Sequence, residues 1–421
     1  MLNYEPSEII VSGIGITSAI GQGKSAFISA LLEGRHNFSV MKRPGRQVPF
    51  NPTYASENRG NSTGFLGAEI DSLQIPESIS KKQLRTASFS TKVALATLQE
   101  AWLDANLNEV EPTRIGLIVG GSNFQQRELV LTHEKHQNRS QFVQPTYGMS
   151  FLDSDLCGLC TEVFNIKGFA YTVGGASASG QVAVINAINA VQSGQVDVCI
   201  ALGALMDLSY WECQALRSLG AMGSIRYSSE PELACRPFDK NRDGFIFGES
   251  CGAVVIQKSD FAKREGVQPY ARLKGWAIGM DGNRNPNPSL EGEVGVIKNA
   301  IKHSGLVENQ IDYINPHGSG SKIGDEIELK AISQCGLNHS FINTTKSITG
   351  HGLSAAGIVE LIATILQMKA GSLHPCRNLD NPMESEYNWV RQRMVSHSIQ
   401  NALNVSIGFG GINTAVVLQT V

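Results

Sequence analysis

The stretch Val173–Gly194, VGGASASGQVAVINAINAVQSG, sets the first constraint on the fold. From Gln181 onward it carries Val, Ile and Ala with only single polar residues between them. A helix that is apolar around most of its circumference is buried on all sides. The small residues before it let other groups approach the backbone closely. We therefore expect a helix in the middle of a layered protein, with Ser177 at its entrance as either a helix cap or a nucleophile.

Strand-like and helix-like segments alternate along the rest of the chain, which predicts an α/β fold with both sheet faces covered. A second helix that is apolar on most sides is expected at 354–371, in the second half of the chain. The halves 1–258 and 259–421 repeat the same succession of elements, and no low-complexity linker separates them. These features indicate an internally duplicated, five-layered fold. Strands are expected at 196–205, 248–258 and 270–280. Strands that run into glycine turns or loops are expected within 8–21, 114–121 and 311–320, and a strand–turn–strand hairpin at 402–419. Helices are expected at 25–34, 84–105, 181–194, 292–305 and 354–371.

Composition and charge narrow the class of protein. The 421 residues suffice for one large or two ordinary domains. A net charge of −3, from 35 basic and 38 acidic residues, gives no general attraction to nucleic acid. No run approaches the roughly 18 uninterrupted apolar residues of a membrane span. The N-terminus, MLNYEPSEII, lacks the basic and apolar regions of a signal peptide. We expect a cytoplasmic protein that contacts neither nucleic acid nor membrane.

The eight cysteines do not form a recognisable metal site. Cys157 and Cys160 make a lone CxxC motif, without a second pair or a histidine at matching distance. We therefore expect structural thiols and no bound metal.

Four glycine-containing loops carry polar or aromatic side chains at expected strand ends or helix starts. They are 173–180 with Ser177, 316–328 with His317, 345–360 with Lys346 and His351, and 406–413 with Phe409. Taken singly, each has an ordinary explanation: a surface histidine, a solvated lysine, a helix contact or a tight hairpin. Their occurrence together, at positions where α/β proteins place their sites, indicates one active site.

These loops, together with RPFDKNRDGFIFGE at 236–249, resemble the β-ketoacyl synthases of the thiolase superfamily. These are the condensing enzymes of fatty-acid and polyketide synthesis, and the resemblance spans nearly the whole chain. It implies the duplicated five-layer α-β-α-β-α fold and a homodimer. It also implies a substrate held as a thioester on the phosphopantetheine arm of an acyl carrier protein, with no further cofactor.

The resemblance assigns roles to individual positions. His317 and His351 match the two active-site histidines of the family, and Lys346 matches its lysine. Ser177, within Ala176–Gly180, stands where the family has its nucleophilic cysteine. Glu360 matches a supporting glutamate, and Phe409 matches the phenylalanine that gates the acyl pocket. The positions expected to contact the pantetheine arm are Ser319, Ser321 and Gly410.

The serine changes the expected reaction. A cysteine thiolate at a helix N-terminus accepts an acyl chain, whereas a serine hydroxyl is far less acidic and needs a paired base. Decarboxylation of a malonyl thioester needs no nucleophile, only donors for the developing oxyanion, which His317 and His351 supply. The resemblance thus points to the decarboxylating branch, which forms acetyl carrier protein for an HMG-CoA-synthase-like enzyme of polyketide β-branching.

Two alternatives stay open from the sequence. The first is a ketoacyl synthase or acyltransferase that uses Ser177 as an oxyester nucleophile. The second is a non-catalytic partner subunit, like a chain-length factor, although such subunits generally lose the histidines that this chain keeps at 317 and 351.

Overall fold

Two sets of five strands with the same spatial order form the centre of the molecule. The computed structural model describes residues 7–49 and 64–421, so part of the N-terminal stretch considered for a signal peptide lies outside the described residues. The first set has the order β6-β5-β7-β9-β1 and the second β12-β11-β16-β17-β10. Their bounds are β1 Ile9–Ser18, β5 Ile115–Gly120, β6 Phe169–Val173, β7 Val198–Gly203 and β9 Ser250–Lys258, then β10 Ala271–Met280, β11 Tyr313–Asn315, β12 Phe341–Ile342, β16 Asn401–Gly408 and β17 Ile412–Gln419.

The pairing pattern also repeats, which confirms the predicted duplication. In the first set β5 pairs in parallel with β6 and β7, and β9 runs antiparallel to β7 and β1. In the second set β11 pairs in parallel with β12 and β16, and β17 runs antiparallel to β16 and β10. The sets join where β1 meets β10, at the pairs Ile10–Arg272 and Val11–Ala271. The chain passes from the first set to the second between Lys258 and Ala271.

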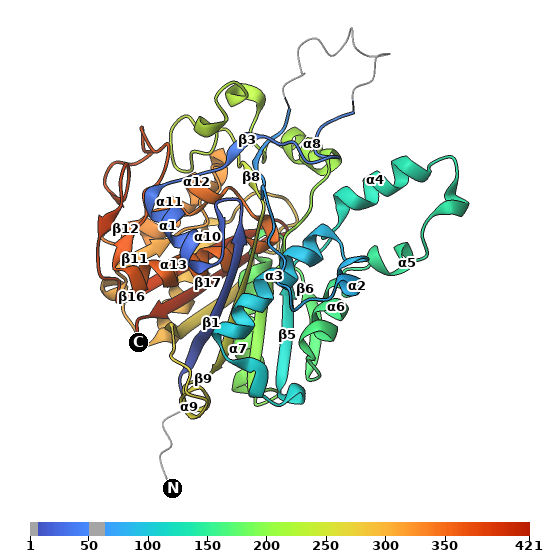
Figure 1. The fold of residues 1–421 in the computed structure, drawn as a ribbon. Helices are drawn as coiled ribbons and strands as arrows, with labels where there is room; N and C mark the ends of the chain where they lie inside the picture. Colours follow the sequence, from blue (N-terminus) through green and yellow to red (C-terminus); the bar gives the residue numbers. More distant parts are fainter. Residues whose placement is uncertain (1–6, 50–63) are drawn as a thin grey trace.

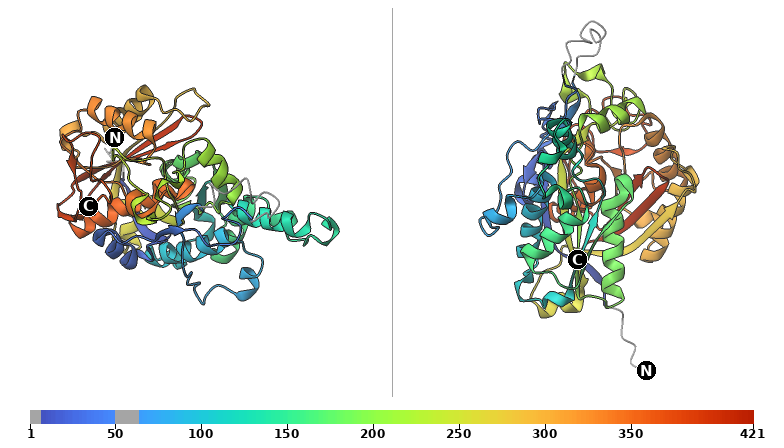
Figure 2. Two further views of the ribbon diagram at one scale, coloured as in Figure 1. Left: turned by 90° about the horizontal axis from the view of Figure 1, so that it is seen from above. Right: turned by 90° about the vertical axis from the view of Figure 1, so that its right-hand side faces the viewer.

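Helices cover the strands in three layers (Figures 1 and 2). The helices α7 (Ser179–Gln192) and α13 (Ala356–Ala370) pack on each other between the two strand sets. The outer face of the first set is covered by α3 (Phe89–Asp104) and α6 (Ser154–Phe164). The outer face of the second set is covered by α10 (Leu290–Ser304) and α11 (Lys322–Gln334). This is the predicted α-β-α-β-α arrangement.

The central layer holds the largest hydrophobic core, built by small and branched side chains of α7 and α13 against both strand sets. One helical stretch in the described part of the chain, Leu353–Ala370, has the length and composition of a membrane span. It contains α13, and 83% of that window is buried inside the protein. Its apolar character is therefore explained by its position between the two sheets.

The remaining elements are shorter. Among the longer helices, α6 and α11 were not predicted, and the start of α3 differs from the prediction. The helix expected from Leu84 begins at Phe89, because the Ser88 hydroxyl accepts a hydrogen bond from the Thr91 backbone N–H at 3.1 Å and caps it there. The helices α4 and α5 project away from the body of the molecule (Figure 1). The shorter elements are α1 Lys24–Glu33, α2 Lys81–Leu84, α4 Gln126–His136, α5 Tyr147–Ser150, α8 Tyr210–Ser218, α9 Ser259–Arg264, α12 Lys346–Thr349, β2 Gly21–Gln22, β3 Phe38–Val40, β4 Leu66–Ala68, β8 Phe247–Gly248, β13 Ser372–Leu373, β14 Asn388–Trp389 and β15 Val395–Ser396.

All eight cysteines are free and buried. Cys157 and Cys160 lie in α6 and pack into the outer core of the first half. A buried position in an apolar core suits a structural thiol.

Candidate active site

The entrances of the two central helices meet at the candidate site. A single 3-10 turn, Ala176–Ala178, precedes α7, and a second one, Leu353–Ala355, precedes α13. Ala176 has φ 46 and Leu353 has φ 50, so both turns begin with a residue other than glycine in the left-handed region. Such backbone costs about 1–3 kcal/mol and is concentrated at functional sites, where the surrounding structure holds it in place. The duplication thus builds two matching turns, and these bring Ser177 and His351 together.

Ser177 and His351 share a hydrogen bond whose direction the surroundings decide. The Ser177 Oγ lies 3.1 Å from Nε2 of the buried His351 ring. The Leu353 backbone N–H donates to Nδ1 of the same ring at 3.2 Å. A neutral ring with Nδ1 as acceptor carries its proton on Nε2. His351 is therefore the donor and Ser177 the acceptor, so this histidine is not arranged to remove the serine proton.

His317 follows β11 and points its ring toward His351. The ring centroids lie 5.4 Å apart at an interplanar angle of 80°. The backbone N–H groups of His317 and Gly318 donate to the two carboxylate oxygens of Glu328 at 2.5 and 2.7 Å. The Lys346 Nζ lies 3.5 Å from Nδ1 of His317 and, as an ammonium, can only donate to it. The proton of this ring is therefore also on Nε2.

Lys346 and Glu360 form a buried ion pair behind the two histidines. The Lys346 ammonium donates to Glu360 and to the His317 backbone oxygen. Together with Nδ1 of His317, these acceptors occupy its three N–H groups. Burial raises the pKa of Glu360 to about 7, against the opposing effect of the Lys346 charge. Neither side chain lines the cavity. Lys346 holds His317 and places a positive charge beside its ring, and Glu360 holds Lys346.

Burial and the Lys346 charge set the protonation of both histidines. Burial first, and then Lys346, hold the pKa of His351 well below its usual value. The same two causes, together with the neighbouring His351, lower the pKa of His317. Each ring is thus neutral near pH 7 and offers one N–H as an uncharged donor.

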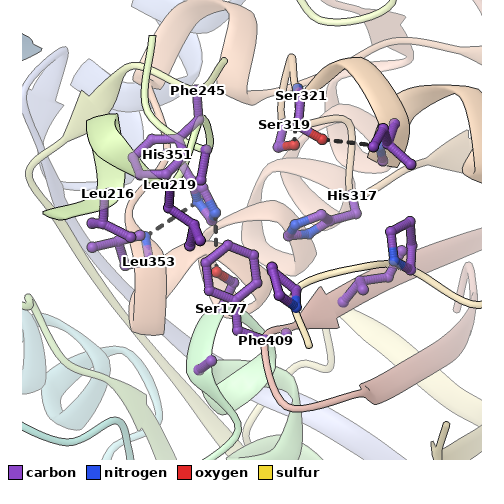
Figure 3. A pocket seen from close by; sticks show the side chains of 18 of the residues that line it. Ser177, Leu216, Leu219, Phe245, His317, Ser319, Ser321, His351, Leu353 and Phe409 are labelled. Carbon is purple, nitrogen blue, oxygen red and sulfur yellow. Dashed lines mark hydrogen bonds between the residues drawn. The ribbon is translucent and has the colours of Figure 1, made fainter. Parts of the chain in front are cut away.

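A cavity of about 730 Å³ opens in front of these groups (Figure 3). It brings together most of the residues expected from the sequence: Ser177, His317, His351, Ser319, Ser321 and Phe409. Phe409 is 45% exposed, on the hairpin between β16 and β17, and its ring lies beside Ser177 in Figure 3. Gly410 is in the same hairpin, with φ 89, but is not among the described residues that line the cavity.

Some lining residues had no signal in the sequence. Met206, Leu216 and Leu219 form an apolar wall at and near α8, opposite the polar loops. In the sequence, such residues cannot be distinguished from ordinary core or surface positions, because only the fold brings them to the cavity. Glu328 is also not predicted as a site residue, although it lies at the end of the polar loop 316–328.

The motif at 236–249 fastens the loop that carries the serines. Phe238, at φ 61, donates its backbone N–H to Asp325 at 2.7 Å. The Arg242 guanidinium donates to the backbone oxygens of Ser321 and Lys322. Its role in this structure is to hold the start of α11 beside the cavity, rather than to contribute a group to the reaction.

Comparison with known proteins agrees with this geometry. The family model described as "Beta-ketoacyl synthase, N-terminal domain" matches residues 6–262, and "Beta-ketoacyl synthase, C-terminal domain" matches 270–380. The chain is 60% identical over 414 residues to the polyketide biosynthesis malonyl-ACP decarboxylase PksF of Bacillus subtilis (strain 168), covering 98% of this chain and 97% of that one. It is 30% identical to the 3-oxoacyl-[acyl-carrier-protein] synthase 1 of Haemophilus influenzae, covering 97% of this chain and 98% of the relative.

Solved structures share the fold at lower identity. The ishigamide ketosynthase/chain length factor has a TM-score of 0.88 at 22% identity and covers 99% of this chain and 100% of its own. A type II ketosynthase solved in complex with its acyl-carrier protein (AntDE:AntF) has a TM-score of 0.83 at 23% identity and covers 99% of this chain and 100% of its own. With both family models and a full-length relative matched, this chain belongs to the β-ketoacyl synthase family.

Proposed function

We propose that this protein decarboxylates malonyl-acyl carrier protein to acetyl-acyl carrier protein in polyketide biosynthesis, without forming an acyl-enzyme. The observation that carries the proposal is the convergence of two neutral histidine N–H donors in front of a serine that accepts, rather than gives, a hydrogen bond. The similarity to PksF, which is named a malonyl-ACP decarboxylase, supports it.

The two histidines supply the electrostatic part of the reaction. With the thioester oxygen between Nε2 of His317 and Nε2 of His351, both N–H groups donate to it, and the His351 N–H exchanges Ser177 for this oxygen. The bond between the methylene carbon and the carboxylate then breaks, CO2 leaves, and the electron pair becomes an enolate whose charge sits on that oxygen. A proton from water on the methylene carbon completes the acetyl thioester. One such donor contributes about 3–4 kcal/mol of transition-state stabilisation.

The position of Ser177 fits this reaction better than acyl transfer. A serine nucleophile needs a neighbouring base that accepts its proton. Its neighbour His351 presents an N–H instead, because the Leu353 backbone occupies the ring's other nitrogen. Ser177 is thus placed to accept a hydrogen bond at the end of the cavity and to contact the malonyl group without being acylated.

We further propose the setting in which the enzyme works. The product suits an HMG-CoA-synthase-like partner of polyketide β-branching, as the family resemblance implies. We place the enzyme in the cytoplasm, as expected from the sequence. The chemistry needs no metal or bound cofactor, because the substrate brings its own phosphopantetheine arm. A homodimer is supported by β6, one of the two edge strands of the described sheet, whose Tyr171 is 42% exposed. Light scattering on the purified protein tests the dimer.

The function is tested with malonyl-loaded carrier protein, followed by intact mass. We expect the carrier to lose one CO2 while the enzyme keeps its own mass. An acyl adduct on Ser177 during turnover would show covalent chemistry and contradict the proposal, as would an unchanged substrate across carriers of the producing pathway.

A further inference from the structure

The charged side chains around the cavity are unevenly distributed by sign. Four carboxylates line it, whereas Lys322 is the only lysine or arginine among the described lining residues. The proposed substrate carries two negative groups, the malonyl carboxylate and the phosphodiester that links pantetheine to the carrier. We propose that Lys322 forms a phosphodiester-binding subsite at the cavity mouth. This inference rests on the proposed function and deepens it.

The position of Lys322 suits the outer end of the arm. Lys322 is exposed yet lines the cavity, so it belongs to the rim. It follows Ser321 directly, and Ser319 and Ser321 lie together and apart from Ser177 in Figure 3. An arm that passes the two serine hydroxyls on its way to Ser177 therefore has its phosphate end near Lys322.

The backbone of Lys322 is fixed while its ammonium stays available. The Arg242 guanidinium donates to the Lys322 backbone oxygen at 2.6 Å. Within residues 7–49 and 64–421, the Lys322 side chain has no ion pair, unlike Lys330 on the same helix, which binds Glu326 at 2.7 Å. A lysine with a held backbone and a free ammonium is ready to bind an anion.

The four carboxylates are engaged with groups of the protein itself. Asp325 and Glu328 are buried and accept backbone N–H groups of the loop at 317–320. Asp243 accepts from Ser224, and Asp281 accepts from Asn413 at 2.5 Å. Burial raises the pKa of Asp325 to about 6 and that of Glu328 to about 8, so the negative charge that disfavours a phosphate near the rim comes mainly from the half-buried Asp243 and Asp281. A single cation there offsets this repulsion where the arm enters.

The reacting carboxylate is the less suitable ligand for Lys322. A cation on that carboxylate stabilises the charge that decarboxylation must remove, and so opposes the reaction. The wall formed by Met206, Leu216 and Leu219 is apolar and bears no charge. We therefore assign the Lys322 cation to the phosphate, since no other lysine or arginine is among the described lining residues of the cavity.

The test compares substrates with and without the phosphate. Wild-type and Lys322→Ala enzymes are assayed with malonyl-phosphopantetheine and malonyl-pantetheine. We expect Lys322→Ala to raise KM about 5- to 20-fold for the phosphorylated substrate only, with kcat unchanged. The salt dependence of that KM should also weaken. Lys322→Arg should retain most of the difference in KM between the phosphorylated and the unphosphorylated substrate. Lys330→Ala, on the same helix but away from the cavity, is the matched control.

Two results would overturn the inference. One is an equal effect of Lys322→Ala on both substrates, which indicates a structural role or contact with the shared malonyl-pantetheine part. The other is a phosphate-dependent effect in Arg284→Ala, beside the rim residue Asn285, but not in Lys322→Ala. Calorimetry of phosphopantetheine and pantetheine binding separates this inference from the proposed function. Calorimetry measures binding at the subsite without turnover. If only the proposed function is wrong, the wild-type enzyme binds phosphopantetheine and pantetheine but decarboxylates neither malonyl substrate.

Discussion

At the scale of single residues, the site is defined by where three protons lie. Nε2 of His351 and Nε2 of His317 each carry one, because Leu353 N–H and Lys346 occupy the two Nδ1 atoms. The third is the Ser177 hydroxyl proton, which has no base beside it among the described contacts. The same residue types with the opposite ring tautomers would form a nucleophilic site.

Replacing either histidine should remove most of the activity. We expect His317→Ala and His351→Ala each to lower kcat for malonyl-carrier decarboxylation about 100-fold or more, since each removes one oxyanion donor. Single-turnover assays at saturating substrate, with thermal unfolding to confirm that the variants are folded, provide the measurement. Activity within a few-fold of wild type in both variants would contradict the two-donor mechanism.

Replacing the serine should have a much smaller effect. Ser177→Ala removes a hydrogen-bond acceptor but no donor to the developing charge, so we expect decarboxylation within about 10-fold of wild type. The same mass assay of carrier protein measures it. Complete loss of activity would indicate that Ser177 takes part covalently.

The pH dependence follows from the lowered pKa values of the two histidines. A free histidine gains a proton below about pH 6.5, whereas these rings resist protonation because burial and Lys346 disfavour a second charge. The neutral form is the active one, since protonation at Nδ1 turns an acceptor for Leu353 N–H or Lys346 into an opposing donor. We expect kcat to stay level as pH falls through 6.5 and to decline only at more acidic pH. Because Glu360 has a pKa of about 7, the profile is also measured in Glu360→Gln; an acid limb centred at or above 6.5 that persists in this variant would contradict the prediction.

At the scale of elements, the β16–β17 hairpin is pressed against the entrance of α7. A Cβ atom added to Gly408 would lie 2.1 Å from the Gly175 backbone oxygen. We expect Gly408→Ala to displace the hairpin that carries Phe409, lowering the free energy of unfolding by about 1–3 kcal/mol and reducing activity. Urea unfolding and the decarboxylation assay measure the two effects.

A second glycine provides the control for that variant. Gly295 lies inside α10, and a Cβ atom added there meets no other group within 4 Å. We expect Gly295→Ala to be neutral or to stabilise the protein by up to about 1 kcal/mol, with unchanged activity. Equal losses in both variants would show that Gly408 has no special contact.

The two central helices and the long buried strands could be predicted from periodicity, whereas the helices α4, α6, α8 and α11 were not predicted. The buried helices α7 and α13 are apolar on nearly every side, so their sequence alone specifies them. The start of α3 was placed too early because the Ser88 cap is a single hydrogen bond within an otherwise helix-like run. The edge strand β6 was not predicted, since its five residues, FAYTV, are too few for a clear alternation.

At the scale of the whole molecule, no cysteine takes over the position of the nucleophilic thiol that the family resemblance implies at residue 177. All eight cysteines are buried, and burial raises the pKa of each thiol, to about 11 for Cys157 and Cys335. A thiol with a raised pKa is a poor nucleophile. We therefore expect iodoacetamide to leave the folded enzyme active and unmodified by intact mass. The Ser177→Cys variant should gain one modifiable thiol at the cavity, which shows that the reagent has access.

The division of the chain at residue 258 stays a prediction. The strands divide there by topology, but β1 pairs with β10 and α7 packs on α13 across the division. The halves therefore share one core, and expression of 1–258 alone is the direct test of whether the first half folds independently.

The sequence by itself determined the class of fold, its duplication, the loops that carry chemistry, and the serine in place of a cysteine. These are properties of residue types and of their spacing along the chain. Only the tertiary structure decided how the loops act: which nitrogen of each histidine bears the proton, and that Lys322 is the one cation among the described cavity-lining residues. The reason is physical, because a proton's position and a charge's surroundings depend on contacts between residues far apart in the chain. Ser177 and His351 meet only because two helix entrances, one in each half of the duplicated fold, face each other.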